Sequence, residues 1–437
     1  MRFMYALASY KIRFIAIAVV SMAGIGEVAL MAREKPSDNS SQTTASGVEL
    51  TNRIDTLTYD QVHAQERMDP GALYLPDRVV SPISPVVVRR DDPKRPTYQE
   101  ALGYTFLINN AKFPGVVRMD DGLLVLCLTG VLDPPNKRVG LILDSRDGLA
   151  WTKPRRLPTQ RVTPVNIGGG KLMICSSQMW FSNDAGQTWS DPKPIPALPD
   201  GRSCNSDVAY HPLVEGDTLT FLFWSPVYPG YNHFHDGELF TQTSLRRYHL
   251  DRDTWDAPVM LPLHWGLNEG SLARAPNGDL VGAFRTQMLG VPIDNDHWMG
   301  LATSVSTDDG KTWTDPARHF EYGRVHCSLL NLPDGRILMT YAVRIGQLDG
   351  HPYHGIEAVL SDDNGRTWDW DHRMILARWP NSTMHSPRSA LLDDGRVLTI
   401  YMNDTFFSWT EDGRHPMHGN KVETPYCGNV SAVIWRL

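Results

Sequence analysis

Six positions in the chain share one spacing, because each lies nine residues before a turn glycine. An arginine can bind an anion through its planar guanidinium, and carboxylates and histidines can transfer protons near neutral pH. The set therefore indicates a site at which strand ends converge, although a hydrated, inert channel is the alternative. Five occupants are polar and four of these are ionisable: Phe113, Arg161, Asp207, Glu269, His326 and Ser386.

The glycines belong to a repeated motif in which a turn precedes an apolar run. Asp-Gly or Asn-Gly between two apolar runs is a strong signal for a β-hairpin. The motif predicts six hairpins, and the positions nine residues upstream then open the innermost strand of each unit. The copies are DDGLLVLCL at Asp120, GGGKLMIC at Gly168, EGDTLTFLFW at Glu215, NGDLVGAF at Asn277, PDGRILMTY at Pro333 and DDGRVLTIY at Asp393.

A second repeat, S-x-D-x-G-x-T-W, begins at Ser182, Ser306 and Ser361, with a shortened copy at Asp144 and a weaker one at Leu250. Its aspartates could bind metal ions, but one copy in each unit favours a structural turn. Glycine supplies a positive φ, the Ser and Asp side chains accept hydrogen bonds from nearby backbone N–H groups, and the tryptophan packs on the turn. We therefore predict no metal site here.

The two repeats together predict an all-β fold, a six-bladed β-propeller of four-stranded antiparallel blades over residues 79–437. A single unit of this kind cannot bury both of its faces, and radial stacking of the units removes that problem. The apolar run from Val79 is expected to close the ring by pairing with the C-terminal VSAVIWRL.

Residues 1–32 have the pattern of a signal peptide or an N-terminal anchor. Three basic residues precede an apolar stretch over residues 14–25, and Gly24 and Gly26 offer a possible cleavage site before Glu27. Residues 33–78 are expected to form a polar tether and lead-in. The protein is therefore expected to be exported as a periplasmic, extracellular or membrane-anchored protein, with membrane contact only through this segment.

Composition excludes several classes of protein. The 437 residues carry a net charge of −7, which gives no electrostatic reason for nucleic-acid binding. The 35 glycines, 31 prolines and 13 tryptophans disfavour a helix bundle. The five cysteines form no C-x-x-C pair, which excludes a zinc ribbon and a dithiol redox motif. Histidine pairs at 233/235 and 351/354 could hold a metal, but no spacing requires one, and we predict no cofactor.

The S-x-D-x-G-x-T-W segments resemble the Asp-box, or BNR repeat, of the sialidase (neuraminidase) superfamily, over about residues 79–437. NEGSLARAPNGDLVGAFR resembles the family's fourth blade, which implies a catalytic Glu269 and a carboxylate-binding Arg285. The resemblance places Arg344, in YAVRIG, as the third arginine of the carboxylate-binding triad. Lys112, in AKFPGVVRMDDG, replaces the first arginine, and Asp133, in VLDPPNKRVG, matches the family's loop aspartate.

The sequence departs from the family where the sixth blade opens. Ser386, in HSPRSALLDDG, stands where the family has its tyrosine nucleophile, and His385 and Arg388 flank it. Three routes remain open: another tyrosine such as Tyr426 could reach the site, water could attack directly, or His326 or His385 could abstract a proton from a uronic acid and cause elimination. In the hydrolytic routes Glu269 would be the base and Asp133 the acid.

These residues predict an exported, sialidase-like exo-acting glycosidase on an acidic (carboxylated) sugar, with an acidic glycan as its partner. One alternative is a uronate-specific propeller lyase or hydrolase, and another is a catalytically silent glycan-binding propeller. The candidate catalytic residues are Asp133, Glu269, His326 and His385, and the candidate substrate-binding residues are Lys112, Arg161, Asp207, Arg285, Arg344 and Arg388.

Overall fold

The regular structure of the described residues consists of β-strands alone. The structure is a computed structural model. No helix in the part of the chain that it describes has the length and apolar character needed to cross a membrane. All described residues lie in the unit Asn52–Leu437: residues 72–74, 78–79, 108–109, 111–133, 137–204, 212–226, 241–261, 268–287, 299–321, 323–348, 351–379, 383–404 and 429–437.

Six antiparallel sheets follow one another along the chain, and each begins with the predicted hairpin. Blade one has β4 (Ala111–Arg118), β5 (Leu124–Asp133), β6 (Lys137–Ser145) and β7 (Arg155–Arg156); blade two has β8 (Thr163–Asn166), β9 (Leu172–Cys175), β10 (Gln178–Ser182) and β11 (Lys193–Pro194); blade three has β12 (Leu213–Glu215), β13 (Thr218–Pro226), β14 (Thr241–His249), β15 (Thr254–Trp255) and β16 (Val259–Met260).

The second half of the unit repeats this arrangement. Blade four has β17 (Asn268–Arg274), β18 (Leu280–Gln287), β19 (Met299–Ser306) and β20 (Ala317–Phe320); blade five has β21 (Arg324–Asn331), β22 (Ile337–Leu348), β23 (His351–Ser361) and β24 (His372–Trp379); blade six has β25 (Thr383–Leu391), β26 (Val397–Asp404), β27 (Asn429–Trp435) and β2 (Arg78–Val79).

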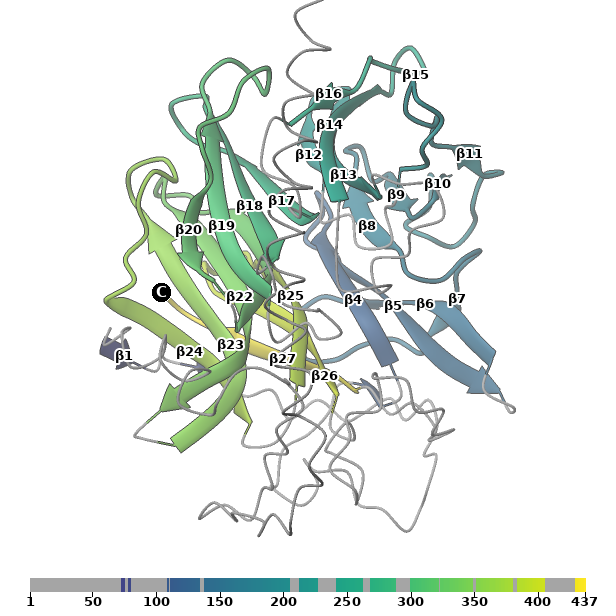
Figure 1. The fold of residues 1–437 in the computed structure, drawn as a ribbon. Helices are drawn as coiled ribbons and strands as arrows, with labels where there is room; N and C mark the ends of the chain where they lie inside the picture. Colours follow the sequence, from purple (N-terminus) through teal and green to yellow (C-terminus); the bar gives the residue numbers. More distant parts are fainter. Residues whose placement is uncertain are drawn as a thin grey trace, which may run out of the picture. The chain divides into compact units, whose positions relative to one another are not determined.

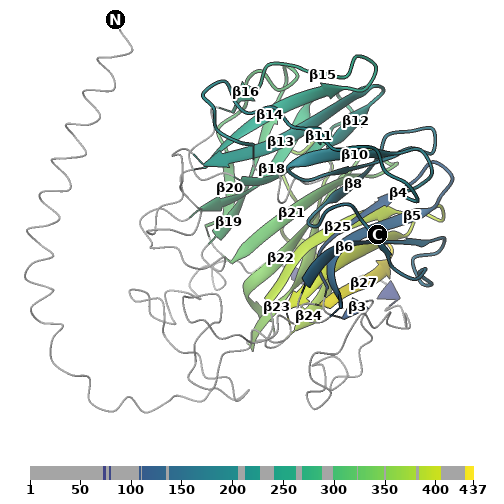
Figure 2. The same ribbon diagram turned by 90° about the vertical axis from the view of Figure 1, so that its right-hand side faces the viewer.

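The blades form a ring, because the first strands of successive blades contact one another. Strand β17 lies against β21, β21 against β25, β25 against β4, and β4 against β8. Figure 1 shows the sheets following one another around a common centre, and Figure 2 shows the same strands from the side. The prediction of an all-β, six-bladed propeller with four-stranded antiparallel blades is confirmed.

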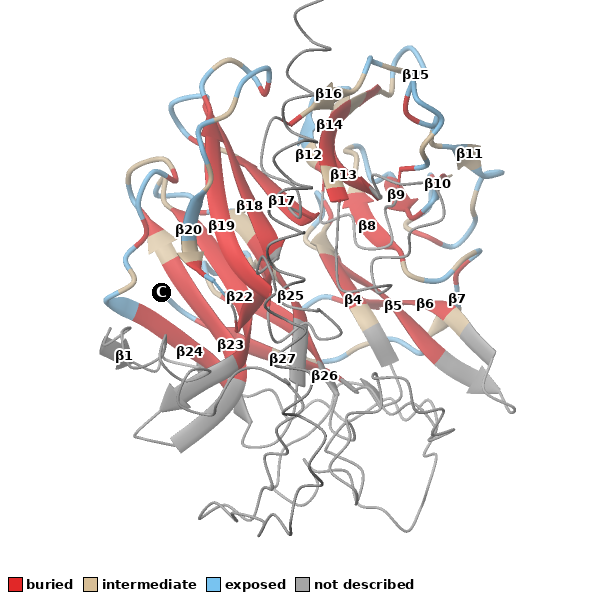
Figure 3. Ribbon diagram, viewed as in Figure 1, coloured by how far each residue is buried: buried red, intermediate tan, exposed pale blue. Residues whose placement is uncertain are grey.

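The hydrophobic core lies between neighbouring blades. Six clusters of buried residues each join adjacent sheets, and one of them joins blade six to blade one through residues such as Ile434 and Leu126. In Figure 3 the strands are buried over most of their length, whereas the outer turns are exposed. A blade therefore depends on both neighbours to remove its apolar faces from water.

The first hairpin of each blade turns at a glycine with a left-handed backbone. Only glycine adopts this conformation without a steric cost, which explains why the motif repeats. The φ angles lie between 58° and 90° at Gly122, Gly170, Gly216, Gly278, Gly335 and Gly395.

The N-terminal part of the unit closes the ring. Strand β2 pairs with β27, with Val79 opposite Ile434, as the apolar run from Val79 predicts. Strand β3 (Ile108–Asn109) also pairs with β27. Strand β1 (Ala72–Tyr74), within the predicted lead-in, adds to blade five in parallel with β24. The predicted export segment lies outside the described residues.

The aspartates of the second repeat accept hydrogen bonds from residues of their own turns. In the blade-four turn, Asp308 Oδ1 accepts a hydrogen bond from the Thr312 N–H at 2.8 Å, and Asp308 Oδ2 accepts one from the Thr312 hydroxyl at 2.6 Å. Ser306 Oγ accepts a bond from the Gly310 N–H at 2.7 Å. The turns at Ser182 and Ser361 repeat this pattern. These contacts agree with the predicted structural role.

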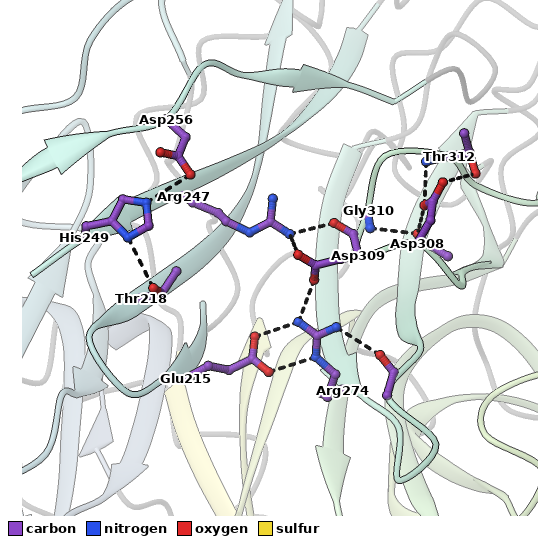
Figure 4. A network of polar contacts seen from close by, with 12 residues as sticks. Glu215, Thr218, Arg247, His249, Asp256, Arg274, Asp308, Asp309, Gly310 and Thr312 are labelled. Atoms are coloured by element: carbon purple, nitrogen blue, oxygen red, sulfur yellow. Dashed lines mark hydrogen bonds and ion pairs between the residues drawn. The ribbon is translucent and has the colours of Figure 1, made fainter.

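The same turn joins blade four to blade three at the surface. Arg274 Nε and Nη2 donate to the two carboxylate oxygens of Glu215 at 2.8 and 2.7 Å. Arg274 Nη2 also donates to Asp309, which is 2.9 Å from Arg247 Nη2 in blade three. Figure 4 shows this network beside the Asp308 turn. Because both arginines are held by carboxylates, the exposed edges of the two blades are connected by polar contacts as well as by the core.

The turn aspartates are expected to make the protein sensitive to acid. Hydrogen bonds from the Thr188 and Thr312 hydroxyls lower the pKa values of Asp184 and Asp308 from 3.8 to about 2. Because the folded pKa is depressed, the stabilisation is present above about pH 4 and is lost as the pH falls towards 2. We expect the thermal unfolding midpoint to drop over this interval in a pH series.

The variant Asp308→Asn should flatten that dependence, because it removes one of the titrating carboxylates from the turn. Asp362→Asn, which changes an exposed aspartate of the blade-five turn, is the matched control. A pH dependence that is equally steep in both variants would contradict the assignment.

Candidate functional site

The six positions identified by spacing have one backbone conformation wherever the structure describes them. Their φ angles are 52° at Phe113, 54° at Arg161, 46° at Glu269, 57° at His326 and 49° at Ser386. Asp207 lies outside the described residues. A left-handed backbone at a residue other than glycine costs about 1–3 kcal/mol and is concentrated at functional sites. The five residues therefore mark a repeated, strained feature at the start of the first strands.

A β-bulge accompanies this conformation in four blades. The pairing of the first two strands shifts between Lys112 and Gly115, between Asn268 and Ser271, between Val325 and Ser328, and between His385 and Arg388. A bulge inserts an extra residue and redirects a side chain out of the regular alternation. The bulges therefore aim the residues at these positions differently from the core residues around them.

Four of the predicted residues meet between blades four and five. Glu269 Oε2 lies 3.0 Å from Arg285 Nε and 3.0 Å from His326 Nδ1. Arg344 Nη2 lies 3.1 Å from His326 Nε2. Arg285 Nε also donates to Asn268 Oδ1 at 2.8 Å. These five residues, called the Glu269 network below, connect two arginines, one carboxylate and one imidazole in a chain of polar contacts.

His326 contacts a guanidinium with one ring nitrogen and a carboxylate with the other. An arginine has only donors, so Arg344 Nη2 donates in its 3.1 Å contact with His326 Nε2. His326 Nδ1 lies 3.0 Å from Glu269 Oε2. The Glu269 carboxylate is therefore in contact with both His326 and Arg285.

The Glu269 network is nearly removed from solvent. Glu269 and His326 are 6% and 5% exposed, and Arg285 and Arg344 are each 2% exposed. A charge at low dielectric is stabilised only when it is paired and hydrogen-bonded, which the carboxylate and the two arginines achieve together. Neighbouring Cys327 is no competing nucleophile at neutral pH, because burial raises the pKa of its thiol to about 12.

Asn268 is a residue of this network that the sequence motifs do not predict. It directly precedes Glu269 and lies opposite Arg285 in the pairing of β17 with β18. Residues directly opposite each other in antiparallel strands have side chains on the same face. Knowledge of the register would therefore have pointed to Asn268 as the acceptor for Arg285.

A small pocket lies on another part of the ring, between blades one, two and six. Its volume is about 20 Å³, and its described lining includes Phe113, Arg161, Thr163, Ser386 and Arg388. Three of these residues have the left-handed conformation described above. The structure thus brings the predicted Arg161 and Arg388 together at one pocket.

A second buried polar cluster lies within the sheet of blade five, on strands β21, β22 and β23. The Tyr341 hydroxyl donates to Glu357 Oε2 at 2.6 Å, and Arg324 Nε lies 3.7 Å from the same oxygen. Burial raises the pKa of Tyr341 well above 10, and the Glu357 charge adds to this effect. The phenol therefore stays protonated. Nothing in the sequence singled out this pair.

Several predicted residues are described only by their backbone. Lys112 is in β4, Asp133 is the last residue of β5, and His385 is in β25. Their side chains, and all of Tyr426, lie outside the described residues. The catalytic and substrate-binding roles assigned to these residues stay predictions.

Comparison with known proteins gives one similar sequence. A sialidase of Paraclostridium sordellii is 30% identical over 113 residues, which are 25% of this chain and 25% of that protein. The match thus spans about a quarter of the length of this curated relative. No family model matches the chain.

Solved structures resemble the chain over most of its length. A protein of unknown function from Dyadobacter fermentans covers 75% of this chain and 95% of its own length, with a TM-score of 0.54 and 18% identity. The leech intramolecular trans-sialidase covers 75% of this chain and 68% of its own, with a TM-score of 0.52 and 12% identity.

The NanB sialidase of Streptococcus pneumoniae covers the same shares, 75% and 68%, with a TM-score of 0.50 and 10% identity. At such low identities the likeness concerns the fold alone. The chain therefore has a six-bladed propeller fold similar to that of the sialidases.

Proposed function

We propose that this protein is an exported, exo-acting glycosidase that acts on a sugar carrying a carboxylate. The observation that carries the proposal is the Glu269 network, in which a carboxylate is buried and oriented at the start of β17. The similarity in fold to sialidases supports a glycosidase, and the predicted N-terminal segment supports export.

Charge at the strand ends supports an acidic substrate. Among the described residues at the two sites, four arginines, Arg161, Arg285, Arg344 and Arg388, accompany one carboxylate, Glu269. An excess of positive charge in a concave region of low dielectric attracts anions. Guanidinium groups also match the planar geometry of a carboxylate.

Glu269 would act as the general base in this reaction. A carboxylate in contact with both Arg285 and His326 keeps one orientation, which a general base requires. Ser386 stands at the tyrosine position of the resembling family, and a serine hydroxyl is a weak nucleophile until a base activates it. We therefore propose that Glu269 removes a proton from an attacking water as that water bonds to the anomeric carbon. Asp133 is proposed to protonate the departing oxygen.

The test is an assay of the full-length protein on matched chromogenic glycosides: a sialoside, a glucuronide and the corresponding glucoside. We expect release of the chromophore from an acidic glycoside and little from the glucoside. Preference for the glucoside would overturn the acidic specificity.

A parallel assay on uronic-acid oligosaccharides separates hydrolysis from elimination. New reducing ends without ultraviolet absorbance indicate hydrolysis. Absorbance from a new carbon–carbon double bond would identify a lyase and overturn the proposed reaction. Glycan binding without turnover on any of these substrates would identify the silent propeller.

A further inference from the structure

We propose that Asn268 is a positioning residue for proton transfer by Glu269: its amide oxygen takes the single Nε hydrogen of Arg285 and so keeps the Glu269 carboxylate basic. This inference rests on the proposed function and concerns the same site. Asn268 acts through Arg285 and Glu269, and no contact between its own side chain and the substrate is required.

The backbone of β17 brings two successive side chains to one guanidinium. In a regular strand, Asn268 and Glu269 would point to opposite faces of the sheet. Glu269 instead has a φ angle of 46°, and the pairing of β17 with β18 shifts between Asn268 and Ser271. Asn268 Oδ1 then lies 2.8 Å from Arg285 Nε, and Glu269 Oε2 lies 3.0 Å from the same nitrogen. The strained backbone thus has a local result, because it places an amide and a carboxylate on the same arginine.

The two contacts of Arg285 Nε differ in kind. This nitrogen carries one hydrogen, which it donates to Asn268 Oδ1. Its contact with Glu269 Oε2 is an ion pair that does not use this hydrogen. The charge of Arg285 therefore stabilises the carboxylate across 3.0 Å, while the amide oxygen receives the directional hydrogen bond.

This division suits a carboxylate that must accept a proton. A hydrogen bond donated to a carboxylate favours its charged form, which makes the carboxylate a weaker base. The amide of Asn268 diverts one such bond and adds no second negative charge beside Glu269. Asn268 is 1% exposed, so bulk water does not compete for the Arg285 hydrogen. A neutral acceptor at this position therefore fixes the guanidinium without reducing the basicity of Glu269.

Other groups around Glu269 also influence its protonation. A purely structural role for Asn268, in which it only satisfies a buried donor, predicts a loss of stability without a change in the protonation of Glu269. Variants of Asn268 keep every other described group, so a change in that protonation reports the amide. The described charged and titratable groups are Arg285 in β18, His326 and Cys327 in β21, and Arg344 in β22.

The experiment follows the protonation of Glu269 in the full-length protein by NMR of isotope-labelled glutamate carboxyl carbons, and Glu269→Gln identifies the signal. Asn268→Leu keeps the size of the side chain and removes the acceptor, so the Arg285 hydrogen turns to Glu269. The titration midpoint of Glu269 should then fall by roughly one pH unit. Asn268→Asp places a second carboxylate beside Glu269 and should raise the midpoint by roughly one pH unit or more. Asn331→Leu is the matched control, at an exposed asparagine of β21 that donates to the Arg274 carbonyl, and it should change nothing.

Turnover of the preferred acidic glycoside gives a second readout. The acidic limb of the pH profile of kcat/KM should move with the midpoints, downwards in Asn268→Leu and upwards in Asn268→Asp. Above this limb, kcat of Asn268→Leu should be lower by roughly three- to tenfold, because a weaker base removes the proton more slowly. Its KM should change little, since the substrate does not contact Asn268.

The outcomes separate this inference from the proposed function. Midpoints that do not move, or that move in the same direction in both variants, would overturn the inference, while turnover of acidic glycosides would leave the proposed function standing. Opposite shifts without turnover of any glycoside by the unaltered protein would overturn the proposed function alone. Opposite shifts that the pH profile does not follow would overturn both. Thermal unfolding shows whether each variant is folded, and Asn268→Ala replaces the leucine variant if that one is not.

Discussion

Replacing Glu269 with glutamine will lower kcat/KM on the preferred acidic glycoside by roughly 10²–10⁴-fold, the size of a general-base contribution. Glutamine keeps the shape of the side chain and an oxygen that can accept hydrogen bonds from Arg285 and His326, but it cannot take up the proton. Affinity for the substrate should change little, because glutamine keeps the size of the side chain and can keep its contacts with Arg285 and His326. The loss should therefore fall on kcat rather than on KM.

The matched control for this variant is Glu215→Gln. Glu215 is an exposed carboxylate that also pairs with an arginine, Arg274, but it lies on blade three at the surface network. Its replacement should leave turnover unchanged. The decisive readout is the pH profile of kcat/KM: the acidic limb should disappear in Glu269→Gln and persist in Glu215→Gln. Retention of full activity in Glu269→Gln would remove Glu269 from the reaction.

Replacing Glu357 with alanine will lower the free energy of unfolding by about 3–5 kcal/mol, the usual cost of leaving a buried charge without its partner. Glu357 is fully buried and accepts the Tyr341 hydroxyl bond at 2.6 Å. Its carboxylate also lies 3.7 Å from Arg324, which is 5% exposed. Without this carboxylate, the Arg324 charge and the Tyr341 hydroxyl each lose a partner inside the sheet of blade five.

Chemical denaturation followed by tryptophan fluorescence measures this loss. The control is Glu321→Ala, which changes an exposed glutamate just before β21. Its free energy of unfolding should lie within about 0.5 kcal/mol of that of the unaltered protein, as is usual for surface substitutions. Binding of the acidic sugar by Glu357→Ala should be normal at temperatures where the variant is folded. A loss of less than about 1 kcal/mol would show that the cluster is not a net determinant of stability.

Local spacing was sufficient to predict the blades and the positions at their inner ends. A turn glycine, an apolar run and a fixed number of residues back to the strand start are all properties of one hairpin. They act over about ten residues and do not depend on the rest of the chain. For this reason the spacing alone predicts that five residues are equivalent, and their shared left-handed backbone agrees with that equivalence: Phe113, Arg161, Glu269, His326 and Ser386.

The pairing of those residues depended on the tertiary structure. Spacing could not show that His326 lies between Glu269 and Arg344, because these residues come from different hairpins and their contact depends on how two blades twist against each other. The Asn268 contact depends on strand register, and the Tyr341–Glu357 pair depends on packing inside blade five. The sequence by itself determined a propeller with polar residues at the inner strand ends. The packing of its blades decided which of them contact one another, because such contacts are made across segments that the local pattern does not connect.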